Sequence, residues 1–215
     1  MAAWIEAVIE AYVGPMRAGK TERAMGFLRH MMRMESRGRG VPFAFVRPVL
    51  DNRQDNPTEI VDHNRTVLQG VEAVIIDHKK PEEMLTHPLI QAAKVVLIDE
   101  AQFFDRTVCR VVLDLFLAGK HIKLFGVDTD HLGRTFITIG GILGLADTKV
   151  IKMDTAICEV GECRRMATRT IRMIKGKPDS DPSREFVVED RGATYVVACT
   201  RCFVDIMTKA DIEIH

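Results

Sequence analysis

Short apolar runs alternate with longer amphipathic stretches through the first 150 residues of the chain. Strands separated by helices are typical of a mostly parallel sheet that helices cover on its faces. The apolar runs that predict strands are Ala7–Val13, Phe43–Val46, Ala73–Ile76, Val95–Ile98 and Ile122–Phe125. The pattern therefore predicts an α/β fold for this part of the chain.

Three stretches between these runs repeat apolar residues at the period of a helix. They are Lys20–Ser36, Pro81–Ala93 and Thr107–Leu117. The segment Asp128–Gly141 lacks this helical period. It is rich in Gly, Thr and Asp and has few apolar residues, so we interpret it as a long functional loop.

The composition changes near Val150, where cysteines and arginines become frequent. A chain of 215 residues is long enough for one domain of about 150 residues and a smaller module. We therefore expect an α/β domain over residues 1–150 and a small lobe over residues 151–215.

Thirty basic residues balance thirty acidic residues, and no basic stripe stands out. This balance argues against a nucleic-acid-binding surface, which is normally basic. The longest apolar runs are too short to span a bilayer. Met1–Val13 lacks the basic start and long apolar stretch of a secretory signal. We therefore expect a cytoplasmic protein that binds neither nucleic acid nor membrane.

The segment Gly14-Pro15-Met16-Arg17-Ala18-Gly19-Lys20-Thr21 matches the phosphate-binding pattern G-x-x-x-x-G-K-[ST] between an apolar strand and a helix. Glycines let backbone N–H groups curl around phosphate oxygens, and the helix N-terminus adds partial positive charge. In such loops the lysine, here Lys20, reaches the β- and γ-phosphates, and the hydroxyl of Thr21 ligates Mg²⁺. The segment therefore predicts a site for ATP and Mg²⁺.

Two carboxylates, Asp99 and Glu100, follow the apolar run Val95–Ile98. In P-loop enzymes an acid at the end of such a strand holds the magnesium ion, which is the role we expect for Asp99. Glu100 is then a candidate general base. Because ATPases also place a base here to activate water, these two motifs indicate a nucleoside triphosphate but do not identify the acceptor.

Four of the five cysteines lie in the last third of the chain, as Cys158, Cys163, Cys199 and Cys202. Their C-x₄-C and C-x₂-C spacings suit a tetrahedral structural zinc site with no open position for catalysis. The fifth, Cys109, lies in an apolar helical run and is expected to be a core residue.

These motifs occur together, and in the same order, in the zinc-containing thymidine kinases of bacteria, animals and large DNA viruses, which the chain resembles over almost its full length. The segments that carry the resemblance are Trp4–Gly14 with the Met16-containing P-loop, Arg47-Pro48 with Asp51-Asn52-Arg53, Asp62-His63-Asn64, Asp99-Glu100-Ala101-Gln102-Phe103-Phe104, Gly126-Val127-Asp128-Thr129-Asp130 with Arg134-Thr135-Phe136, Thr168-Arg169-Thr170-Ile171-Arg172, and Tyr195 with Cys199 and Cys202.

The resemblance implies transfer of the γ-phosphoryl group of ATP to the 5′-hydroxyl of a pyrimidine deoxynucleoside. It implies that Glu100 takes the hydroxyl proton and that Lys20, Thr21, Asp99 and Arg53 neutralise charge on the phosphates. It also implies a RecA-like domain and a zinc-ribbon-like lobe with a lasso loop that closes over the base. The residues implied to bind the nucleoside are Met16, Gln102, Phe103, Phe136, Thr170 and Tyr195. A homotetramer that dTTP inhibits by feedback is implied by the resemblance alone.

The chain departs from the family pattern at several places. Arg17 and Ala18 stand where the family has an aromatic or polar residue followed by a small one. Gln54 replaces a tyrosine, His131 stands where the lasso loop presents a phenylalanine, and Thr135 replaces a proline. The first cysteine pair, Cys158 and Cys163, is two residues wider than the C-x₂-C of the family. The imidazole of His131 could hydrogen-bond a polar group, so a 5-substituted deoxyuridine is an alternative to thymidine as substrate.

Two other classes of protein remain open on the residues alone. One is a P-loop ATPase with a zinc ribbon, which would hydrolyse ATP and respond to DNA. The other is a regulatory P-loop protein that binds a nucleotide without turning it over. Phosphorylation of thymidine separates the kinase from both.

Overall fold

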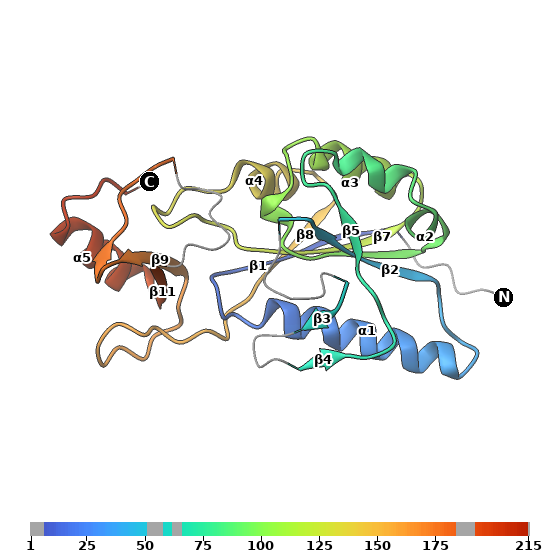
Figure 1. Cartoon of the computed structure of the whole chain (residues 1–215), viewed down its shortest axis with the longest axis horizontal. Helices are drawn as coiled ribbons and strands as arrows, with labels where there is room; N and C mark the ends of the chain where they lie inside the picture. The colour runs from blue at the N-terminus through green and yellow to red at the C-terminus, as the bar shows by residue number, and fades with distance from the viewer. Residues whose placement is uncertain (1–6, 51–57, 62–65, 184–191, 215) are drawn as a thin grey trace.

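The structure is a computed structural model, and it describes residues 7–50, 58–61, 66–183 and 192–214. It has two parts that lie side by side (Figure 1). The larger part is a sheet with helices on both faces, and the smaller part contains β9, β11 and α5. In the part of the chain described, no helix is both long enough and apolar enough to cross a membrane.

The central sheet has six strands in the order β5-β2-β6-β7-β1-β8, and every neighbouring pair is parallel. The strands are β1 (Ile9–Val13), β2 (Phe43–Pro48), β5 (Val74–Ile76), β6 (Val95–Ile98), β7 (His121–Gly126) and β8 (Thr148–Lys152). All five strands predicted from the sequence are present, which confirms the α/β fold. Because the strands are parallel, their carboxyl ends meet at one edge of the sheet, where α/β proteins bind ligands.

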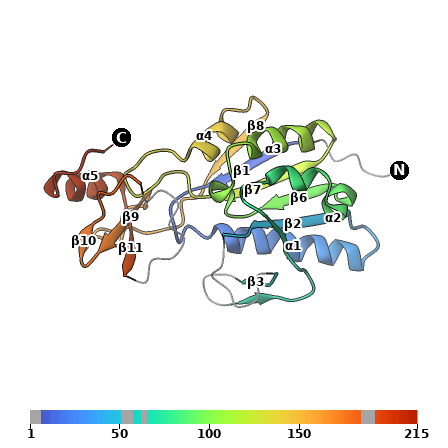
Figure 2. The same cartoon turned by 45° about the horizontal axis from the view of Figure 1, so that its top comes forward.

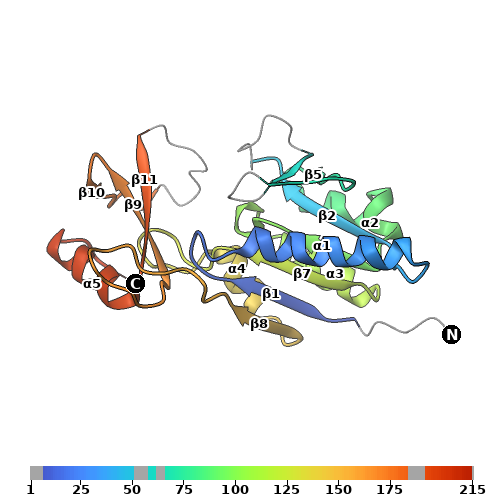
Figure 3. The ribbon, with the colours of Figure 1, turned by 90° about the horizontal axis from the view of Figure 1, so that it is seen from below.

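Helices cover the two faces of this sheet, as Figures 2 and 3 show. The helix α1 (Lys20–Ser36) packs Ala24, Met25 and Leu28 into the core of one face. The other face is covered by η1 (Pro81–Leu85), α2 (Pro88–Ala92), α3 (Val108–Leu117) and α4 (Ile137–Leu143). The two cores have the sheet between them, so β1, β2 and β6 are largely buried on both sides, whereas the edge strand β8 has no buried residue.

The single helix predicted over Pro81–Ala93 is divided into η1 and α2. Pro88 causes the break, because it has no N–H to donate and excludes the helical conformation from the residue before it. His87 accordingly has φ −68° and ψ 124°, which is extended backbone.

The segment Asp128–Gly141, interpreted as a loop, contains the first part of α4. Gly141 allows close packing of α4 on α3, because a Cβ atom there would lie 2.6 Å from Sγ of Cys109. The strand β8 was also not predicted, and it carries the sheet through Lys152, beyond the composition change near Val150.

The small lobe is an antiparallel sheet in the order β10-β9-β11, followed by α5 (Thr200–Lys209). Its strands are β9 (Arg169–Ile174), β10 (Lys177–Pro178) and β11 (Ala193–Ala198). A separate hairpin, β3 (Ile60–Val61) with β4 (Val67–Leu68), lies near α1 (Figure 1). The core of the lobe is small and is shared with the four cysteines, so a bound metal would add much of its stability.

Candidate active site and cysteine cluster

The phosphate-binding segment connects β1 to α1 at the carboxyl edge of the sheet. Gly19 precedes the first helical residue with φ 72° and ψ 22°, a left-handed conformation that favours glycine. Lys20 is buried, and its ammonium group donates to the carbonyl oxygens of Gly14 at 3.2 Å and Pro15 at 2.7 Å. The lysine therefore lies against the loop that is expected to hold phosphate.

Asp99 follows β6 and faces the start of α1. The Thr21 hydroxyl donates to Oδ2 of Asp99 at 3.3 Å, and the backbone N–H of Glu100 donates to Oδ1 at 3.0 Å. A hydroxyl and a carboxylate side by side are the hard oxygen ligands that Mg²⁺ prefers. The donor set at this position therefore fits a magnesium ion.

Glu100 is buried and has φ 50°, a left-handed conformation that is strained for a residue with a side chain. Its Oε2 accepts a hydrogen bond from Nε2 of Gln102 at 2.6 Å. Oε1 of Gln102 in turn accepts from the backbone N–H of Val127, just after β7, at 3.1 Å. Gln102 thus orients the carboxylate of Glu100 and ties it to the next strand.

The residues expected to bind the nucleoside separate into two places. The Met16 N–H donates to the Thr170 hydroxyl at 3.0 Å, and the carbonyl oxygen of Tyr195 accepts from the guanidinium of Arg17 at 3.1 Å. These contacts bring the P-loop against β9 and β11. Phe103, in η2 (Ala101–Phe103), is half-buried, whereas Phe136 is buried in the core beside α4. Arg53 lies outside the described residues, as do Gln54 and Asp62-His63-Asn64.

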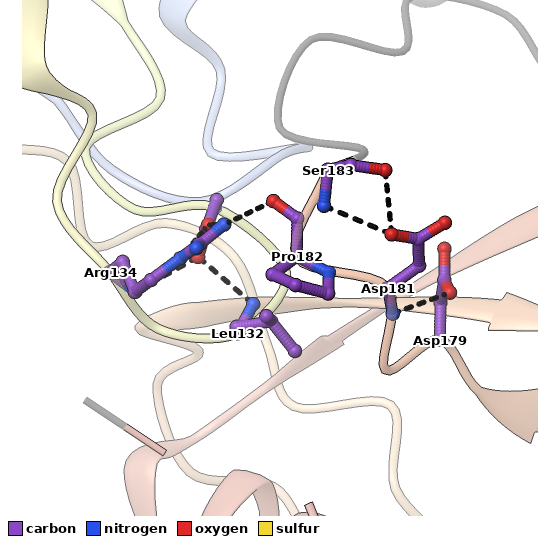
Figure 4. Close-up of polar contacts among 7 residues, drawn as sticks. Leu132, Arg134, Asp179, Asp181, Pro182 and Ser183 are labelled. Atoms are coloured by element: carbon purple, nitrogen blue, oxygen red, sulfur yellow. Dashed lines mark hydrogen bonds and ion pairs between the residues drawn. The ribbon is translucent and has the colours of Figure 1, made fainter. Parts of the chain in front are cut away.

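A network that sequence reasoning missed holds the loop between β7 and α4. Oδ1 of Asp130 accepts from the backbone N–H groups of Leu132 and Arg134, each at 2.9 Å. The Arg134 guanidinium donates to Oδ2 of Asp130 at 2.6 Å and to the Pro182 carbonyl at 3.1 Å (Figure 4). The loop is therefore bound to the segment after β10. The four-residue spacing of Asp130 and Arg134 is a sequence signal that could have indicated the pair.

His131, on the same loop, is only 6% exposed. Burial lowers the pKa of its imidazole below the ordinary value, although the charges of Asp130 and Asp179 act in the opposite direction. The neighbouring Arg172 also lowers it, and Arg172 forms a buried ion pair with Asp179. The site therefore favours a neutral His131.

The four cysteines of the small lobe converge, with all sulfur atoms within 4.8 Å of one another. Sγ of Cys163 lies 3.9 Å from Sγ of Cys199. Zn–S bonds of about 2.3 Å in a tetrahedron would place sulfurs about 3.8 Å apart, so the cluster fits a metal of that geometry. A hydrogen bond from the backbone N–H of Cys202 lowers the pKa of Cys199 to about 6, while the hydrogen bond with Cys199 raises the pKa of the Cys202 thiol to about 12. A metal that binds the four sulfurs would therefore displace protons.

These features define the class of P-loop α/β proteins, here with a four-cysteine lobe attached. A family model described as thymidine kinase matches residues 7–203, and the chain belongs to this family.

Individual relatives agree with this assignment. The chain is 33% identical over 187 residues to the thymidine kinase of Aster yellows witches'-broom phytoplasma (strain AYWB), covering 87% of this chain and 81% of the relative. The thymidine kinase of Onion yellows phytoplasma (strain OY-M) gives the same identity and coverage. The thymidine kinase of Mesoplasma florum is 32% identical over 195 residues, covering 91% of this chain and 90% of that protein.

Proposed function

We propose that the protein is an ATP-dependent thymidine kinase that transfers the γ-phosphoryl group of ATP to the 5′-hydroxyl of thymidine, deoxyuridine or a 5-substituted deoxyuridine. The observation that carries the proposal is the position of Thr21, Asp99 and Glu100 beside the P-loop, in a chain that belongs to the thymidine kinase family. This arrangement provides a metal-ligand pair and a separate carboxylate for a proton.

Phosphoryl transfer depends mainly on positioning and on neutralising charge. In the proposed complex the backbone N–H groups of residues 17–21 hold the phosphates, since Pro15 has no N–H and the N–H of Met16 donates to Thr170. Lys20 leaves the carbonyls of Gly14 and Pro15 to bind phosphate oxygens. Thr21 and Asp99 would hold Mg²⁺, which neutralises charge on the β- and γ-phosphates. Arg53 is proposed to supply a further positive charge.

Glu100 is proposed as the general base. Its carboxylate would accept the proton of the 5′-hydroxyl as the oxygen attacks the γ-phosphorus in line with the bond to the leaving oxygen. The hydrogen bond from Gln102 orients this carboxylate. The second product is ADP, and the proton is later released to solvent.

The nucleoside is proposed to lie where the P-loop meets the small lobe, beside Met16, Thr170 and Tyr195. Gln102, Phe103 and Phe136 complete the proposed set. The loop of residues 128–136 would act as the lasso, with Asp130 and Arg134 fixing its shape. A closed site excludes water and so favours the nucleoside over hydrolysis.

The remaining parts of the proposal concern the whole molecule. Zn²⁺ is proposed in the four-cysteine cluster, as a structural ion with no open coordination position. A RecA-like domain over residues 1–150, a zinc lobe over residues 151–215, a homotetramer and inhibition by dTTP follow from the family resemblance. A cytoplasmic location is proposed from the N-terminal sequence, Met1–Val13.

The proposal is tested by transfer of labelled γ-phosphate from ATP and Mg²⁺ to a panel of nucleosides: thymidine, deoxyuridine, 5-hydroxymethyldeoxyuridine, deoxycytidine and purine deoxynucleosides. We expect label on the thymine and uracil members alone. Hydrolysis of ATP with no labelled nucleoside would contradict the kinase and support a P-loop ATPase.

A further inference from the structure

Three consecutive residues of the phosphate-binding loop are bonded to the segment that leads into and forms the small lobe. The Met16 N–H donates to the Thr170 hydroxyl at 3.0 Å, and the Ala18 carbonyl accepts from the Thr155 hydroxyl at 2.8 Å. Arg17, between them, contributes its side chain. The loop is therefore positioned by contacts with the lobe and with the segment before it, as well as by β1 and α1 on either side of it.

The guanidinium of Arg17 contacts two residues of the small lobe, Glu159 and Tyr195. Nη1 forms an ion pair with Oε1 of Glu159, and Nη2 donates to the Tyr195 carbonyl at 3.1 Å. Glu159 is fixed in turn, because its Oε2 accepts from the Val197 N–H at 3.1 Å and its own N–H donates to the Val197 carbonyl at 2.9 Å. The fork geometry of arginine suits such a two-point contact.

Both partners of Arg17 are close in sequence to the cysteines. Glu159 follows Cys158 directly, and Tyr195 lies on β11, which ends at the residue before Cys199. Arg17 therefore contacts one residue near each cysteine pair, Glu159 beside the C-x₄-C pair and Tyr195 four residues before the C-x₂-C pair. A metal that fixes the two pairs relative to each other also fixes the two anchors of Arg17.

The backbone at Arg17 makes the loop sensitive to these anchors. Arg17 has φ 59°, a left-handed conformation that costs free energy for any residue with a side chain. Such a conformation persists when surrounding contacts hold it, and the contacts of the Arg17 side chain belong to the small lobe. The direction of the loop N–H groups, which bind phosphate, depends on this conformation.

We propose that Arg17 is a positioning residue that couples the metal state of the cysteine cluster to nucleotide affinity at the P-loop. The inference rests on the proposed binding of ATP and of zinc. Metal in the cluster strengthens nucleotide binding, and by thermodynamic linkage the bound nucleotide strengthens metal binding by the same factor, which slows release of the metal where its association rate is unchanged.

The size of the coupling between metal and nucleotide is limited because the ion pair between Arg17 and Glu159 is partly exposed to solvent. The side chains of Arg17 and Glu159 are 38% and 39% exposed, so solvent and salt screen their attraction. With the second bond to the Tyr195 carbonyl, we expect a coupling factor of about three to ten, at the lower end of allosteric couplings. The factor should decrease at high ionic strength.

The test uses the full-length protein loaded with Zn²⁺. The release of Zn²⁺ to a chromophoric chelator is timed with and without saturating ATP and Mg²⁺, and the Kd for ATP is measured by calorimetry. The variants are Arg17→Ala, Arg17→Lys, which keeps the charge without the fork, and Glu159→Gln, which keeps an acceptor for the Val197 N–H. The control is Arg110→Ala, since Arg110 pairs with Asp114 on the surface of α3.

In the wild type and the control we expect ATP to slow release of Zn²⁺ about three- to tenfold. In Arg17→Ala and Glu159→Gln, ATP should no longer slow the release of Zn²⁺, and the Kd for ATP should rise by a similar factor. Arg17→Lys should keep part of the effect of ATP on Zn²⁺ release and part of the ATP affinity. If ATP does not change the rate at which the wild type releases Zn²⁺, the proposed coupling is wrong, even if the protein phosphorylates thymidine. If Arg17→Ala releases Zn²⁺ more slowly with ATP by the same factor as the wild type, Arg17 does not carry the coupling. A wild type that binds no ATP contradicts both this inference and the proposed kinase.

Discussion

The hydroxyl oxygen of Thr21 lies 3.3 Å from a carboxylate oxygen of Asp99, although the two residues are 78 positions apart in the chain. The parallel order of the sheet produces this proximity. The strands β1 and β6 lie on either side of β7, and the segments that follow them meet at its carboxyl edge. Two motifs that are separate in the sequence thus form one site.

We predict that Asp99→Asn reduces kinase turnover about tenfold or more and raises the Mg²⁺ concentration needed for half-maximal activity, because a neutral amide binds the metal weakly. The measurement is a titration of activity with Mg²⁺ at fixed ATP. Asp114→Asn, on the surface of α3, is the control. An unchanged Mg²⁺ requirement in Asp99→Asn would remove this residue from the metal site.

Replacing one cysteine of the cluster should release its metal. We predict that Cys199→Ser lowers the bound zinc from about one ion per chain to near zero and increases hydrogen exchange in β9, β11 and α5, because the lobe has a small core. Cys109→Ala is the matched control, since this half-buried cysteine lies on α3. Full metal content in Cys199→Ser would show that the ligand assignment is wrong.

The burial of His131 predicts a dependence of stability on pH. Its pKa in the folded protein lies below the ordinary value of about 6.5, so between the two pKa values the unfolded state binds more protons than the folded state. This contribution to stability is therefore complete above pH 6.5 and is lost as the pH falls below it.

We predict that, when the pH is lowered from 7.5 to 5.5, the free energy of unfolding decreases less in His131→Asn than in the wild type. Urea denaturation at each pH measures this free energy. Burial also lowers the pKa of His121, which contributes with the same sign in both proteins, so the difference between the curves isolates His131. Parallel curves would mean that His131 is not neutral in the folded state.

The periodic parts of the fold were predictable from the sequence because burial on both faces gives continuous apolar strands, and one buried face gives helical spacing. The helix α1 begins and ends at the predicted residues, since the P-loop pattern fixes its start. The helix α4 was not predictable in this way. Its sequence ITIGGIL has two glycines and β-branched residues, which are weak helix formers, and its stability comes from packing on the core.

The candidate site was predictable to the extent that it consists of contiguous motifs. Residues 14–21, the pair Asp99 and Glu100, and the cysteines carry local patterns, and the structure adds their distances. The contact of Arg17 with Glu159 has no such pattern, because 142 positions separate the two residues. Only the arrangement of the small lobe against the P-loop brings them together.

The measurement that tests the account most directly is transfer of γ-phosphate from ATP to thymidine by the wild type and by Glu100→Gln, with ATP affinity measured in parallel. The account predicts that the wild type labels thymidine and that Glu100→Gln binds ATP equally well while turning over about 10²–10⁴ times more slowly, the usual contribution of a general base. Equal turnover by the two proteins would contradict the role of Glu100, and absence of labelled thymidine with the wild type would contradict the kinase itself.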